Sequence, residues 1–201
     1  MNSLYDFIVK PVGEKYSNTV KVGGKELTVN TKIENWKFVN RIAEVVKVPS
    51  EFESCIGVGD KVIIHQNVFR TFYDIRGEKK KSRSFLKDDH YLCAIDQIYL
   101  YKNKSGWNAL GKRCFVQPIK NSDDLTTKKE KSLTGILKYG NKSLEDLNIT
   151  PGDVVGFKPN SEWEFLVEGK RLYCMKSNDI VIKYEYQGNE EEYTPSWAQG
   201  G

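Results

Sequence analysis

Two copies of one series of sequence landmarks run along this chain in the same order. The pairs, first copy then second, are Ile8–Pro11 with Phe115–Pro118, Arg41–Val48 with Leu133–Tyr139, Val58–Ile64 with Thr150–Phe157, and Tyr91–Leu100 with Tyr173–Ile180. Several landmarks repeated in one order indicate a duplicated structural unit. The 201 residues therefore predict two domains, each of about a hundred residues, a common domain size.

The two copies differ slightly near their ends and are joined by a polar segment. The spacing from cysteine to isoleucine is one residue shorter at Cys93 and Ile98 than at Cys174 and Ile180. The break between the copies falls at Asn103–Gly106, which is polar and contains glycine. We therefore expect domains at 1–103 and 104–187, followed by a C-terminal tail at 188–201.

Both copies have the pattern of short β-strands. In the second copy, apolar runs of strand length are separated by turn residues at Gly152-Asp153 and at Glu168–Lys170, and a β-branched run follows Asp179. Such runs bounded by turn residues are typical of antiparallel strands. Helical spacing is weak except for one turn at 143–147. The sequence predicts an all-β protein with few helices.

The stretch 151–181 resembles the C-terminal half of a GroES-type co-chaperonin. A Gly-Asp turn at Gly152 leads into a core strand, a hairpin follows at Glu168–Leu172, and a Met-x-x-x-Asp-Ile segment, Met175–Ile180, ends the domain. The resemblance implies two tandem, small, partly open β-barrels. The segments Pro49–Ile56 and Gly140–Ile149 are short where that family has a roof hairpin, which resembles divergent, virus-encoded members.

The resemblance also implies a partner and a binding segment. In that family, a flexible loop after the first strand docks on a chaperonin ring, and the ring binds and hydrolyses the ATP. The first copy has a long insertion at this point, 13–38, whereas the second has a short, polar stretch at 119–132. Lys25 and Glu26 separate the glycines from the apolar residues, a departure from the family pattern. The implied contact residues are Gly23, Gly24, Leu27, Thr28 and Val29.

The same insertion has the pattern of a β-hairpin. Val20 and Val22 on one side, and Leu27 and Val29 on the other, flank a Gly-Gly pair that suits a primed two-residue turn. A packed hairpin favours a second function for the same fold, because fold does not fix function. That function is an assembly or structural role, for example in a virus particle, with binding to a symmetric protein lattice. Self-association into a ring or lattice is expected with either function.

The C-terminal tail combines acidic and aromatic residues. Glu190–Glu192 have the character of a solvated segment. Trp197 is costly to expose to water, so we expect it to pack on its own domain or on a neighbouring subunit. A tail that crosses onto a neighbour would make Trp197 a further partner-binding residue.

A basic run at Arg76–Arg83 raises the question of nucleic-acid binding. Clustered cations can neutralise phosphates, and four aromatic residues lie around the run in the sequence: Phe69, Phe72, Tyr73 and Phe85. Asp74 and Glu78 dilute the positive charge. We therefore predict a solvated loop between strands whose aromatic side chains face the core, and we do not expect a nucleic-acid partner.

Residues that could carry catalysis are few. Neither of the two histidines, His65 and His90, lies beside a recognisable nucleophile motif, and there is no Gly-rich phosphate loop ending in Lys-Ser or Lys-Thr. We expect a non-catalytic protein that binds no cofactor. The four cysteines contain no Cys-x-x-Cys pair, so we expect no metal and treat them as small core side chains.

Apolar runs in this chain are short, and its first residues lack the basic-then-apolar layout of a signal peptide. We therefore expect a protein that acts in the cytoplasm, or in the host cytoplasm if it is viral.

Overall fold

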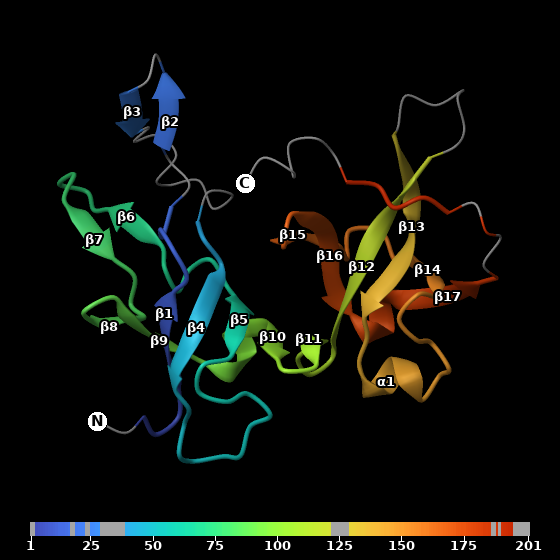
Figure 1. The fold of residues 1–201 in the computed structure, drawn as a ribbon, viewed down its shortest axis with the longest axis horizontal. Coiled ribbons are helices and arrows are strands. Elements are labelled where there is room, and N and C mark those ends of the chain that lie inside the picture. Colours follow the sequence, from blue (N-terminus) through green and yellow to red (C-terminus); the bar gives the residue numbers. More distant parts are fainter. Residues whose placement is uncertain are drawn as a thin grey trace. The chain divides into compact units, whose positions relative to one another are not determined.

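The computed structural model describes residues 3–16, 19–22, 25–28, 39–121, 129–185, 188 and 190–194, with the backbone alone at 19–22 and 25–28. The protein is all-β and divides into two compact units, Met1–Trp107 and Asn108–Gly201 (Figure 1). The segment at 103–106, where sequence analysis places the seam, is instead the turn that joins β10 (Ile98–Asn103) to β11 (Gly106–Ala109).

The first unit is built on a seven-stranded sheet in the order β11-β10-β5-β4-β1-β9-β8. Its other strands are β1 (Phe7–Pro11), β4 (Ile42–Lys47), β5 (Lys61–Ile64), β8 (Phe85–Lys87) and β9 (His90–Cys93). Two hairpins form separate two-stranded sheets: β2 (Thr19–Val22) with β3 (Lys25–Thr28), and β6 (Thr71–Tyr73) with β7 (Lys79–Lys81). A 3-10 turn, η3 (Ile95–Gln97), precedes β10.

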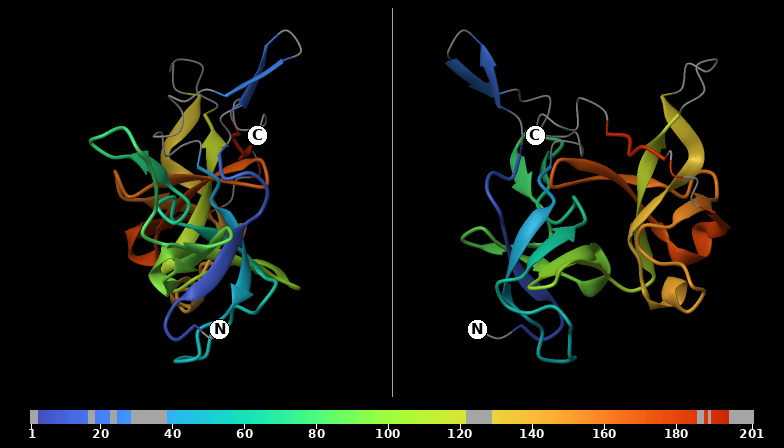
Figure 2. Two further views of the ribbon diagram at one scale, coloured as in Figure 1. Left: turned by 90° about the vertical axis from the view of Figure 1, so that its left-hand side faces the viewer. Right: turned by 45° about the vertical axis from the view of Figure 1, so that its right-hand side comes forward.

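The second unit is built on a six-stranded sheet in the order β15-β16-β12-β13-β14-β17. Its strands are β12 (Arg113–Lys120), β13 (Glu130–Tyr139), β14 (Val154–Phe157), β15 (Trp163–Val167), β16 (Lys170–Lys176) and β17 (Ile180–Tyr184). The helical turn expected from the sequence is α1 (Lys142–Glu145), and a 3-10 turn, η4 (Ser177–Asp179), precedes β17. Figure 2 shows β12 and β13 as long, curved strands of this unit.

The two units share one topology. With β11 set aside, the order β8-β9-β1-β4-β5-β10 corresponds strand by strand to β15-β16-β12-β13-β14-β17. The registers also coincide, because Val9 pairs with Val45 and Val116 pairs with Leu137, at matching positions of the two repeats. The sequence repeat therefore corresponds to a repeat of backbone pairing.

The Gly-Asp turn closes in the same way in both units. Gly59 and Gly152 have φ of +88° and +101°, a region that favours glycine, and each donates its backbone N–H over 2.8 Å to the strand before it. The Asp60 carboxylate accepts a backbone N–H at 2.8 Å, and the Asp153 carboxylate accepts one at 2.7 Å. Asp153 also forms a 2.7 Å ion pair with Lys183 of β17. These residues fix the entry into β5 and β14.

The structure corrects the alignment of the closing segments. Phe7 pairs with Cys93, and Cys114 pairs with Met175. Since Phe7 and Cys114 hold the same position in their strands, Cys93 is equivalent to Met175 and not to Cys174. The one-residue difference inferred from the cysteines therefore disappears. Aligning the two cysteines was misleading, because equivalent positions are defined by strand register and not by residue identity.

Both sheets are open, so the expectation of partly open barrels is corrected to open sheets. Closing a barrel requires the first and last strands to pair, and the edge strands, β11 and β8 in one sheet and β15 and β17 in the other, do not pair with each other. In the described connection 48–60 between β4 and β5 there is no strand, and in 140–153 between β13 and β14 there is only α1. Neither connection contains a roof hairpin.

The core of the second unit lies under α1. Leu144 of α1 is buried there, and the Asn141 side chain caps the helix by accepting the Leu144 N–H at 3.2 Å. The buried residues of this core are Cys114, Val116, Leu137, Leu144, Ile149, Val155, Phe157, Tyr173 and Met175. The first unit buries strand residues at matching positions, including Phe7, Val9, Val45 and Val62.

Gly135 lies in the tightest backbone contact between β12 and β13. A Cβ added there would meet Val116 and would lie 2.6 Å from the carbonyl oxygen of Gln117. We expect Gly135→Ala to lower the free energy of unfolding by about 2–3 kcal/mol, because the two strands must separate. Urea unfolding followed by circular dichroism measures this. Gly140→Ala, whose Cβ would make only a 3.4 Å contact with Leu137, should cost about 1 kcal/mol or less; equal costs would contradict the account.

The cysteines are all free thiols, but they are not all core residues. Cys93, Cys114 and Cys174 are buried, whereas Cys55 is exposed. Burial raises the pKa of Cys93, and burial together with Cys174 raises the pKa of Cys114 to about 12. We expect one thiol, Cys55, to react quickly with a chromogenic disulfide reagent at neutral pH, and the others only after unfolding. Fast reaction at a second site, located by mass spectrometry, would contradict this packing.

Candidate partner-binding site

The insertion between β1 and β4 starts and ends in a hydrogen-bonded clamp, which we define as residues 12–16 and 39–42. The amide nitrogen of Asn40 donates to the carbonyl oxygens of Val12 and Glu14, at 2.8 and 2.9 Å. Its side-chain oxygen accepts the N–H of Ile42 at 2.8 Å, and its own backbone N–H donates to Lys15 at 2.9 Å. One side chain therefore ties together the two ends of the insertion.

Lys15 fixes the clamp to the turn between β8 and β9. Its ammonium lies 2.7 Å from the Asp89 carboxylate and 3.3 Å from the Tyr91 hydroxyl. Burial alone would lower the pKa of Lys15, but the hydrogen bonds to Asp89 and Tyr91 outweigh it and the pKa is raised. The hydrogen bond from Lys15 in turn lowers the pKa of Asp89. Both groups therefore stay charged around neutral pH.

Tyr16 joins the clamp to the start of β6. Tyr16 and Val39 form an antiparallel bridge, which brings together the chain segments on either side of 17–38. The Tyr16 hydroxyl accepts the backbone N–H of Thr71 at 2.5 Å and donates to the carbonyl oxygen of Thr71 at 3.4 Å. The base of the insertion therefore contacts the base of the β6–β7 hairpin.

Within the insertion, β2 and β3 pair as an antiparallel hairpin. Val20 pairs with Leu27, and Val22 pairs with Lys25, which favours the hairpin alternative raised from the sequence. The structure places Leu27 and Thr28 on β3 but describes only their backbone. The other predicted partner-binding residues, Gly23, Gly24, Val29 and Trp197, lie outside the described residues.

The acidic tail is exposed at Glu191 and Glu192, in line with the expectation of a solvated segment, and it is also attached to its own unit. Glu192 forms a bridge with Ile119 of β12 and ion pairs with Lys138 and Lys170. Burial alone would raise the pKa of Glu192, but the hydrogen bonds and positive charges of Lys138 and Lys170 together outweigh it, and the pKa is lowered. The tail also forms backbone hydrogen bonds of 2.8 Å on both sides of this bridge.

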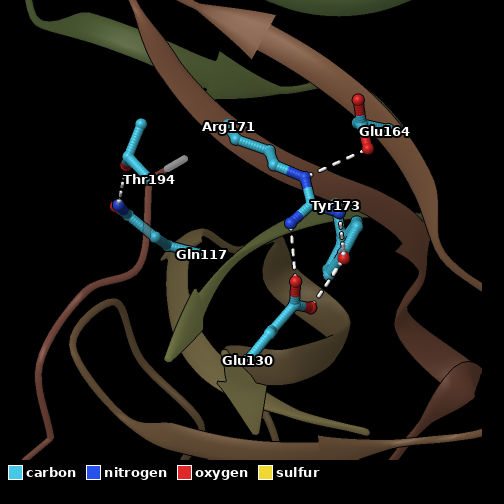
Figure 3. Close-up of polar contacts among 6 residues, drawn as sticks. All are labelled: Gln117, Glu130, Glu164, Arg171, Tyr173 and Thr194. Atoms are coloured by element: carbon cyan, nitrogen blue, oxygen red, sulfur yellow. Dashed lines mark hydrogen bonds and ion pairs between the residues drawn. The ribbon is translucent and has the colours of Figure 1, made fainter. Parts of the chain in front are cut away.

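The buried side chain of Gln117 adds a further contact between β12 and the tail. It is 1 % exposed in β12 and donates to the Thr194 hydroxyl at 3.3 Å (Figure 3). The described part of the tail therefore covers the part of β12 that β16 leaves unpaired.

Arg171 organises a charged cluster at the start of β13 that the sequence did not reveal. Figure 3 shows the guanidinium between two carboxylates, 2.6 Å from Glu130 and 3.0 Å from Glu164. It also donates to the Tyr173 hydroxyl at 2.6 Å, and that hydroxyl donates to Glu130 at 2.6 Å. Burial, followed by the Glu130 hydrogen bond, raises the pKa of Tyr173. The cluster therefore fixes the start of β13, the strand that follows the short connection after β12 in the second unit.

The β6–β7 hairpin departs from the core, and one sequence expectation fails there. The expectation that the aromatic side chains face the core holds for Phe69, which is buried, but not for Phe72 and Tyr73, which are 40 % and 38 % exposed. The reason is that β6 and β7 pair only with each other, so no sheet covers them. Figure 2 shows this hairpin extending away from the seven-stranded sheet.

The described residues contain neither a cluster of metal-ligating side chains nor a membrane-spanning helix. Within the described ranges, no group of three or more His, Cys, Asp or Glu side chains is arranged to hold a metal ion. Of the helices in the described part of the chain, none combines the length and apolar character needed to cross a membrane. No protein-family model matches the sequence, and a comparison with curated proteins finds no match.

Proposed function

We propose that this protein is a non-catalytic, co-chaperonin-like lid that docks on a chaperonin ring and assists protein folding. The observation that carries the proposal is the difference between two units of one topology. The first has a long insertion with a clamped base and a paired hairpin, and the second has a short connection at the same point. The site of action would be the cytoplasm, or the host cytoplasm for a viral protein.

The first unit of each chain then contributes the docking hairpin β2–β3, and the second unit serves structure. Single hairpins bind weakly because ordering and desolvating them costs free energy. A ring of chains overcomes this by presenting several hairpins at once, which raises the overall affinity without new contacts. Self-association is therefore part of the proposal, and ATP is bound by the partner.

A second candidate function is an assembly or structural role, for example as a viral particle component on a symmetric protein lattice. The observation that favours it is the edge strand β17, on which Val181, Ile182 and Tyr184 are 54 %, 46 % and 42 % exposed. An apolar edge strand with unpaired backbone groups invites pairing with another chain. This strand suits either a ring or a lattice.

Native mass measurement of the protein with a purified bacterial chaperonin ring, with and without nucleotide, tests the first function. A nucleotide-dependent complex, together with slower ATP turnover by the ring, is the expected result. Large self-assemblies that ignore the ring would favour the second function.

A further inference from the structure

The tip of the β6–β7 hairpin displays a fully exposed apolar side chain on a rigid turn. Ile75 is completely exposed, beside the half-exposed aromatic residues of β6. The turn beneath it is built by Asp74, whose carboxylate accepts the N–H groups of Arg76 and Glu78, both at 2.9 Å. The carbonyl oxygen of Asp74 also accepts the Gly77 N–H at 2.9 Å. Ile75 is therefore held outward by a satisfied backbone.

The two acidic residues at the tip pair with a lysine of β7 and not with the other cations that the structure describes. Asp74 and Glu78 both pair with one cation, Lys80, at 3.6 and 2.6 Å. Arg76 and Lys79 have no carboxylate partner among the described residues. The tip thus presents an apolar side chain flanked by two uncompensated cations.

We infer that the β6–β7 tip is a second docking element, which inserts Ile75 into an apolar, acid-rimmed groove on the same chaperonin ring that β2–β3 contacts. The inference rests on the proposed function. An apolar anchor on a rigid support, surrounded by charges, is the pattern of a binding hot spot with an electrostatic rim. Because Asp74 fixes the turn beforehand, little conformational entropy is lost on binding.

A protein groove fits this tip better than a nucleic acid does. Single strands are bound by aromatic faces and a charged track along the backbone, and a fully exposed isoleucine at the apex serves neither purpose. The contact between Tyr16 and Thr71 joins the base of the insertion to the base of β6–β7.

The test measures affinity for a purified bacterial chaperonin ring with nucleotide, for the full chain and two variants. Ile75→Ser should weaken binding at least tenfold, and Arg76→Glu/Lys79→Glu should weaken it at least tenfold at low salt, with the difference fading at about 0.5 M salt. The matched controls are Leu147→Ser, at an apolar residue of the second unit that is 67 % exposed, and Lys104→Glu/Lys142→Glu, which makes a similar charge change. Both controls should bind like the wild type.

The outcomes separate the inference from the function it rests on. Normal binding by Ile75→Ser and by the charge variant overturns the inference and leaves the lid function standing. Absence of any complex with the wild type overturns both. A labelled single-stranded oligonucleotide serves as the other arm: salt-sensitive binding that is lost in the charge variant, with ring affinity unchanged, assigns the tip to nucleic acid and overturns the inference.

Discussion

Arg171→Met is expected to lower the free energy of unfolding by about 3 kcal/mol, because it removes the shared partner of a mostly buried charge cluster. The Arg171 side chain is only 14 % exposed and bonds to Glu130 and Glu164. Without it, the two carboxylates repel each other, and the Tyr173 hydroxyl loses one of its partners. Urea unfolding followed by circular dichroism measures the change.

Two further variants make this prediction specific. Lys170→Met removes a neighbouring cation whose side chain is 57 % exposed and whose ion pair with Glu192 spans 3.4 Å, so it should cost about 0.5 kcal/mol or less. Arg171→Lys keeps the charge but cannot reach three partners from one planar group, so its cost should be intermediate. If all three variants had the same stability, the cluster would have no structural role.

Replacing residues 17–38 with a short Gly-Ser-Gly linker is expected to weaken chaperonin docking at least about a hundredfold, because every subunit of a ring loses its docking hairpin. Folding should survive. The Tyr16–Val39 bridge holds the two ends together, and the Asn40 hydrogen bonds lie outside the deletion. The affinity for a purified ring and the urea midpoint are the two readouts.

The second unit provides a matched control for this deletion. Replacing 122–128, at the same point of the repeated topology, with the same linker should leave docking unchanged. An equal loss from both deletions would show that docking does not reside in the insertion. A collapse of stability in the 17–38 variant would show that the clamp depends on the hairpin.

The repeated topology could be predicted because it depends on local chemistry. The Gly-Asp turns at Gly59 and Gly152 need a positive φ, and short apolar runs around them specify strands. The register of the strands was harder to predict. Cysteine identity aligned Cys93 with Cys174, whereas backbone pairing aligns it with Met175. The sheets are open because their edge strands do not pair with each other. A local sequence pattern does not show whether two distant strands pair.

The charged cluster and the exposed hairpin could not be read from the sequence. Glu130 lies 41 residues before Arg171, and only the pairing of β12 with both β13 and β16 brings the two together. Glu164 is seven residues from Arg171, in the β15–β16 hairpin. For β6, the sequence pattern predicts aromatic side chains that face the core, but it does not show that β6 and β7 pair only with each other, which leaves Phe72 and Tyr73 exposed. Long-range pairing decides both features.

Capture by a chaperonin ring tests the lid function most directly. The purified protein is mixed with a bacterial chaperonin ring and nucleotide, and native mass spectrometry reports the stoichiometry while ATP turnover is followed. The account predicts a nucleotide-dependent complex that contains a closed ring of this protein and slows ATP turnover, and that is lost when 17–38 is replaced. No complex with the wild type, and unchanged ATP turnover, would contradict it.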